Sequence, residues 1–143
     1  MSTTDTEFPA VPKDLPPLVG GVVPHLTLSD AVAAIDFYTR AFGAQELTRI
    51  PAQDGKRLMH AHLRVNGSSI MFNDAFVECG QGLVPPQAFA LHLQVDDVEA
   101  WWKRAVEAGA EVVMPLQDMF WGDRYGQVRD PFGVTWSLAA HIR

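Results

Sequence analysis

Histidine is the side chain in this sequence best suited to chemistry near neutral pH, and the chain has five of them. His25 and His92 each stand three residues before the end of a strand-like segment, and His60 and His62 stand two apart in MHAHL. Because side chains alternate across a strand, residues two apart share a face. We expect these four imidazoles on polar sheet faces, where they can bind a ligand, transfer a proton or hold a metal ion.

A second group of side chains that could bind a ligand lies in FWGDRYG, residues 120–126. Trp121 can stack on a ligand, and the planar guanidinium of Arg124 can pair with a ligand carboxylate or phosphate. The alternative is that Arg124 forms an ion pair with Asp123 or Asp130 and only fixes a loop. The sequence leaves both interpretations open.

Hydrophobic periodicity and turn residues predict the elements that must position these groups. Each helix follows an aspartate cap, Asp30 or Asp96-Asp97, and closes at a glycine, Gly43 or Gly109. The predicted strands are 19–28, 45–50, 57–65, 68–74, 89–95, 111–114, 123–129 and 134–140.

The same β-α-β-β-β order therefore occurs twice, and the spacing supports a true repeat. Gly43 and Gly109 are 66 residues apart (109 − 43), as are Gly67 and Gly133 (133 − 67). We expect an α/β (α+β) fold of two tandem repeats, since one helix covers only one face of its sheet. The predicted parts are a flexible N-terminal lead-in at 1–17 and a single domain at 18–143, which comprises repeat 1 (about 19–77), a linker (78–87) and repeat 2 (about 88–142).

Composition excludes several classes of function. With 11 basic and 17 acidic residues, the net charge is −6 (11 − 17), which disfavours binding to nucleic acid or to an anionic membrane. The single cysteine, Cys79, allows no internal disulfide and no cysteine-based zinc site. No apolar run is long enough for a membrane span or a secretory signal, so the expected location is the cytoplasm.

Four segments carry a resemblance to a known family: PHLTLSDAVAAIDFYTRAFGA, MHAHLRVNGSSIMFND, VDDVEAWWKRAVEAGAEVVMP and FWGDRYGQVRDPFGVTWSL. They resemble the vicinal oxygen chelate superfamily of glyoxalases, bleomycin-resistance proteins and extradiol dioxygenases, and within it the PhnB-like branch. The resemblance implies curved sheets around a concave cleft, a homodimer, and four metal-ligand positions. Those positions fall on Val23, Met71, Ala90 and Ser137, none of which is a usual metal ligand.

Three hypotheses follow. The leading one is a small-molecule-binding protein that lacks the metal site and needs no cofactor, and whose apolar or aromatic ligand lies between Trp121, Phe72 and Met71. Its expected ligand-binding residues are His25, His60, His62, Met71, Phe72, His92, Trp121 and Arg124.

The alternative is a lyase, isomerase or dioxygenase with a divalent metal displaced onto His25, His92 and Asp74. The third is an accessory dimer whose cleft has lost its function.

Overall fold

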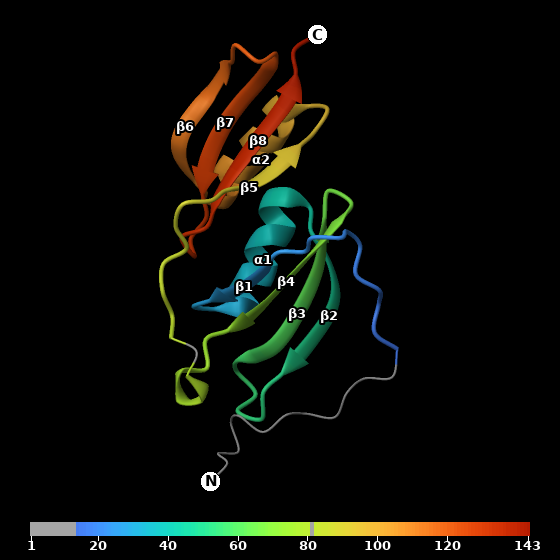
Figure 1. Ribbon diagram of the computed structural model, residues 1–143, viewed down its shortest axis with the longest axis vertical. Coiled ribbons are helices and arrows are strands. Elements are labelled where there is room, and N and C mark those ends of the chain that lie inside the picture. The colour runs from blue at the N-terminus through green and yellow to red at the C-terminus, as the bar shows by residue number, and fades with distance from the viewer. Residues whose placement is uncertain (1–13, 81) are drawn as a thin grey trace. The chain divides into compact units, whose positions relative to one another are not determined.

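The computed structural model describes residues 14–80 and 82–143, so the predicted lead-in lies outside the described residues as far as position 13. The chain divides into two compact units (Figure 1). Unit 1 runs to Thr39 and resumes over Gly43–Val84, and unit 2 comprises Arg40–Phe42 and Pro85–Arg143. Each unit contains one four-stranded sheet.

In unit 1 the sheet has the strand order β1-β4-β3-β2. Strand β1 pairs parallel with β4, and the other pairs are antiparallel. The elements are β1 (His25–Leu28), α1 (Ala31–Phe42, whose last three residues are assigned to unit 2), β2 (Gln45–Pro51), β3 (Leu58–Val65), β4 (Ser68–Asp74) and a 3₁₀ helix (Val77–Cys79).

Unit 2 repeats this topology with the order β5-β8-β7-β6, again with one parallel pair, between β5 and β8. Its elements are β5 (Leu91–Gln94), α2 (Val98–Ala108), β6 (Glu111–Asp118), β7 (Asp123–Arg129) and β8 (Thr135–His141). The repeated β-α-β-β-β order and the α+β class predicted from the sequence are confirmed.

Two strand boundaries differ from the prediction by four residues or more, and each of these differences involves a proline. Strand β1 begins at His25 rather than at residue 19, because Pro24 has no N–H to donate to the ladder. Strand β6 continues past the predicted end at 114 to Asp118, although it contains Pro115. It is an edge strand with a register shift between Met114 and Gln117, the setting in which a strand tolerates proline.

Both predicted helix caps are present. Asp30 and Asp97 each accept the backbone N–H of the third helical residue, at 3.0 Å and 3.1 Å. Gly43 and Gly109 end the helices with positive φ angles of 65° and 116°, a conformation that favours glycine. Within residues 14–80 and 82–143, no helix combines the length and apolar character that a bilayer crossing requires.

Each sheet has a face covered by its helix, here called the helix face, and an opposite open face. In unit 1 the buried ring of Phe72 meets Tyr38 of α1 edge-on, with ring centroids 5.8 Å apart. Phe72 therefore lies on the helix face. In unit 2 a Cβ on Gly126 would lie 2.6 Å from the Trp102 ring of α2, so β7 needs glycine there for α2 to pack closely. Because side chains alternate along a strand, these two contacts determine the face on which each remaining strand residue lies.

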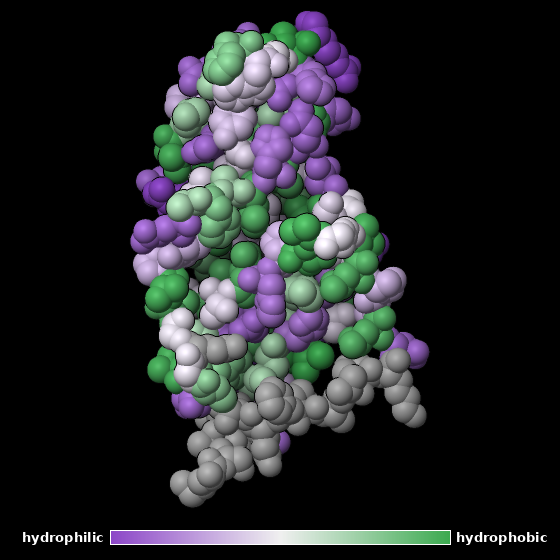
Figure 2. All heavy atoms as spheres, viewed as in Figure 1, coloured by the Kyte–Doolittle hydropathy of each residue, from purple (hydrophilic) through white to green (hydrophobic). Residues whose placement is uncertain are grey.

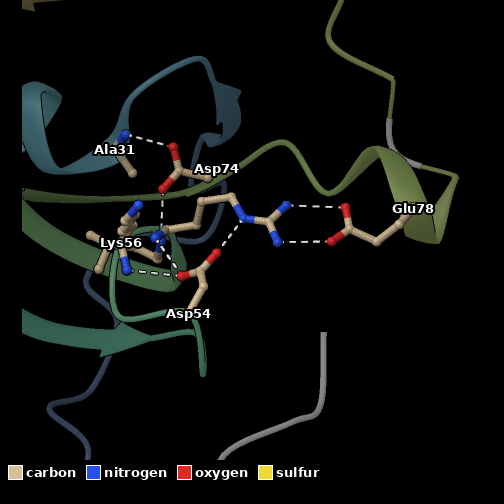
Figure 3. Close-up of polar contacts among 7 residues, drawn as sticks. Ala31, Asp54, Lys56, Asp74 and Glu78 are labelled. Carbon is tan, nitrogen blue, oxygen red and sulfur yellow. Dashed lines mark hydrogen bonds and ion pairs between the residues drawn. The ribbon is translucent and has the colours of Figure 1, made fainter. Parts of the chain in front are cut away.

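Asp74, at the end of β4, joins two elements of unit 1 on the helix face. One carboxylate oxygen accepts the N–H of Ala31 at 2.8 Å, and the other accepts the N–H of Leu58 at 2.7 Å (Figure 3). The first bond satisfies a donor at the start of α1, and the second satisfies a donor at the start of β3. Both bonds are buried, so this carboxylate has a structural role.

Arg57 ties the β2–β3 turn to the 3₁₀ helix. Its guanidinium forms two hydrogen bonds to Glu78, at 3.0 Å and 2.8 Å, and one to Asp54 at 2.7 Å (Figure 3). The guanidinium also lies over the Phe76 ring. Hydrogen bonds from the Arg57 side chain and from the backbone lower the pKa of Asp54 from 3.8 to about 2. This clamp fixes the chain that leaves β4.

Replacing Asp74 with asparagine tests the structural role of its carboxylate. The amide keeps one acceptor but turns an NH₂ group toward the second backbone N–H, which loses its partner. We expect the free energy of unfolding to fall by about 1–3 kcal/mol, the cost of one orphaned buried donor, measured by denaturant titration with circular dichroism. Asp96→Asn, an exposed control, should change it little. Equal stability of the two variants would contradict the assignment.

Candidate functional site

The open face of unit 1 carries three of the five histidines. His25 of β1 and His62 of β3 both lie opposite Met71 of β4, so the three side chains form a row across the sheet. His60 shares the face by alternation. The residues of this face include His25, His60, His62, Arg64, Ser69, Met71 and Asn73.

Hydrogen bonds hold two of these imidazoles. His25 Nε2 lies 3.0 Å from Asn73 Oδ1, and His62 Nε2 lies 2.7 Å from Ser69 Oγ. The Asn73 amide is itself oriented by its NH₂ group, which donates to the Asp74 carbonyl. Since Asn73 Oδ1 can only accept, His25 must carry a proton on Nε2.

The environment favours neutral imidazoles at His60 and His62. Burial lowers the pKa of the His60 imidazole below 6.5, and neighbouring His25 adds to this effect. Burial also lowers the pKa of His62, which is 2% exposed, with further contributions from His60 and Arg64. Each ring therefore offers one N–H donor and one acceptor at neutral pH.

The open face of unit 2 combines a histidine with aromatic side chains. His92 Nδ1 lies 2.6 Å from Ser137 Oγ, and its Nε2 lies 2.8 Å from Gln94 Oε1. The His92 ring stacks beside Tyr125 with centroids 6.1 Å apart. Trp121, in the β6–β7 turn, meets Tyr125 edge-on at 5.5 Å. His92, Tyr125 and Trp121 thus form one aromatic cluster.

Two of the residues expected to bind a ligand lie on helix faces instead. In β4, Phe72 lies between Met71 and Asn73, whose side chains are on the open face. Its own side chain therefore points the other way, into the core against α1. Arg124 lies 2.7 Å from Glu99 of α2 and donates to Asp118 at 3.1 Å. Phe72 therefore cannot share a ligand with Met71, and Arg124 forms ion pairs, although not with Asp123 or Asp130.

Sequence reasoning missed two open-face residues, Arg64 and Tyr125. The same period-two spacing that paired His60 with His62 extends to Arg64, so the signal was present. Tyr125 lies in the predicted strand 123–129, which is β7 in the structure, but side-chain alternation was not applied to that strand.

The residues at the metal positions that the family resemblance implies do not fit a metal ion. Met71 and Ser137 lie on open faces but offer a thioether and a neutral hydroxyl, and Val23 and Ala90 offer no donor atom. In each unit a histidine of the first strand lies opposite the implied ligand position in the last strand. His25 pairs with Met71, and His92 pairs with Ser137.

The displaced metal site does not fit either. Asp74 is on the helix face, whereas His25 is on the open face, and both Asp74 oxygens already accept backbone N–H groups. Across the described parts of the chain, no three His, Cys, Asp or Glu side chains gather in a way that could hold a metal ion.

Comparison with known proteins defines the family. Residues 22–138 match the model of the Glyoxalase/Bleomycin resistance protein/Dioxygenase superfamily, and the chain belongs to this superfamily. It is 50% identical over 126 residues to an uncharacterised protein of Mycobacterium bovis, covering 84% of this chain and 82% of that one. It is 31% identical to protein YjdN of Escherichia coli over 132 residues, covering 77% and 85% of the two chains.

Among solved structures, TioX from Micromonospora sp. ML1 superposes with a TM-score of 0.67 at 32% sequence identity. The match covers 87% of this chain and 98% of TioX. These similarities agree with the topology that the two sheets share.

The lowered pKa values of His60 and His62 predict acid sensitivity. The unfolded chain binds protons at these rings near pH 6.5, before the folded chain does, so the free energy of unfolding should fall as pH drops below about 6.5. The loss is complete once pH is below the folded pKa values. Denaturant titrations between about pH 7.5 and about pH 5 should show this slope, reduced in a His60→Gln/His62→Gln variant. Histidine ring resonances that titrate at or above pH 6.5 would contradict it.

Proposed function

We propose that this protein binds a small organic molecule without a metal ion, and that the aromatic part of the ligand packs on the open face of unit 2. Members of the superfamily bind small molecules, which gives the general class. The aromatic cluster of His92, Tyr125 and Trp121 supports this particular form of binding.

Exposure alone does not mark this cluster, because hydrophobic residues are spread among hydrophilic ones on the face drawn in Figure 2. The observation that carries the proposal is geometric. The Trp121 side chain is 48% exposed, yet it is held edge-on against Tyr125, which itself lies beside the His92 ring. Partly exposed rings held at fixed angles can receive another aromatic ring at small cost in conformational entropy.

Polar groups beside the rings would orient a bound ligand. Gln127 donates to the Tyr125 hydroxyl at 2.9 Å, and Ser137 and Gln94 hold both nitrogens of His92. A few fixed polar groups next to an apolar surface are typical of small-molecule sites.

A metal-dependent enzyme is the rival function, and the donor set described above gives it no support. Metal content of the untagged protein after dialysis against zinc or manganese decides between them. One equivalent per chain, lost in His92→Ala, would overturn metal-independent binding. We also infer a homodimer, as is frequent in the superfamily, which sedimentation would test.

Neutral aromatic probes test the proposed binding surface. Indole and benzamide should shift backbone amide resonances of β7 and of the β6–β7 turn in NMR titrations. Trp121→Ala should weaken this binding by about tenfold, because it removes one stacking surface. Trp101→Ala removes the same ring from α2 and should leave affinity unchanged.

Equal weakening by the two tryptophan variants would indicate a general effect on unit 2 and would contradict a site at Trp121. Absence of any saturable shift with either probe would refute aromatic binding altogether.

A further inference from the structure

Arg64, on the open face of unit 1, has no partner for its charge among the described residues. Its Nε is buried and makes no hydrogen bond, and among residues 14–80 and 82–143 no carboxylate forms an ion pair with its side chain. The other arginine of this sheet's strands, Arg49, forms two hydrogen bonds with Glu46. A buried guanidinium nitrogen without an acceptor is costly, so Arg64 needs an explanation that Arg49 does not.

The sheet of unit 1 keeps its carboxylates off the open face. Only Glu46 and Asp74 are acidic among its strand residues, and both lie on the helix face, opposite Leu63 and Leu28 respectively. The chain as a whole carries six more acidic than basic residues. Among its strand residues, the open face of unit 1 thus has three histidines and one arginine but no acid, whereas the chain as a whole has a negative net charge.

Hydrogen-bond donors accompany the arginine. Arg64 lies opposite Ser69, and His62 lies about 7 Å along the same strand, two residues away. Ser69 Oγ accepts the N–H of Val19 at 2.8 Å, so its own hydrogen is available to His62 Nε2. In that arrangement neutral His62 carries its proton on Nδ1, which leaves this N–H as a donor.

From this placement we propose that the open face of unit 1, considered by itself, binds an oxyanion, the carboxylate or phosphate group of a small molecule, through the Arg64 guanidinium with an N–H of His62. This inference rests on the proposed small-molecule binding and adds an anionic group as what unit 1 recognises. A planar guanidinium matches two oxygens of either group, and such charge-assisted bonds are stronger than neutral ones. An oxyanion would also supply the acceptor that Arg64 Nε lacks.

The test is an NMR and calorimetric titration of the full chain with benzoate, phenyl phosphate and inorganic phosphate, and with neutral benzamide as the matched probe. The anions should shift the Arg64 Nε–H resonance and bind more tightly than benzamide. Comparison of benzoate with phenyl phosphate identifies the preferred oxyanion. Arg64→Gln should weaken anion binding by about tenfold or more.

Arg49→Gln is the matched control, since it removes the same charge from the same sheet but from the helix face. It should leave anion affinity unchanged. Circular dichroism checks that Arg64→Gln folds, and Arg64→Lys, which keeps the charge without the planar fork, should bind anions with intermediate affinity.

Equal losses in Arg64→Gln and Arg49→Gln would show a diffuse charge effect and overturn the proposal. Binding of benzamide without preference for benzoate would also overturn it, while leaving the proposed function intact. If no probe bound at all, both would fail.

Discussion

One helix on one four-stranded sheet is the constraint from which the properties of each unit follow. A helix covers a single face, and strand side chains alternate, so each residue is assigned either to the core or to an open face. Phe72 and Met71 are neighbours in β4, yet one is buried against Tyr38 and the other faces away with His25 and His62. The same division places Arg124 with Glu99 on α2 and Tyr125 with His92.

The sequence was sufficient to predict the fold because local signals agreed with the repeat. Aspartate caps, closing glycines and the 66-residue spacing predicted the topology that the structure shows. Errors arose where two local rules competed. Pro24 shortened β1, whereas Pro115 was tolerated at an edge, and sequence pattern alone does not tell an edge strand from a central one.

The candidate site was less predictable because it depends on which face each side chain occupies. Alternation within MHAHL correctly placed His60 and His62 together, but it was not extended to Arg64. Asp74 looked like a ligand because its type suits metal chemistry, while its hydrogen bonds to Ala31 and Leu58 became visible only in three dimensions. Sequence alone does not distinguish a carboxylate that caps a helix from one that binds a metal ion.

The uneven distribution of tryptophan between the units has a spectroscopic consequence. All four tryptophans, at positions 101, 102, 121 and 136, belong to unit 2, and unit 1 has none. Trp136 is 1% exposed and Trp121 is 48% exposed, so intrinsic emission combines a core reporter with a surface reporter of the same unit. Quenching by a soluble agent would therefore sample Trp121 first, whereas local unfolding of unit 1 must be followed through Tyr38 or its histidines.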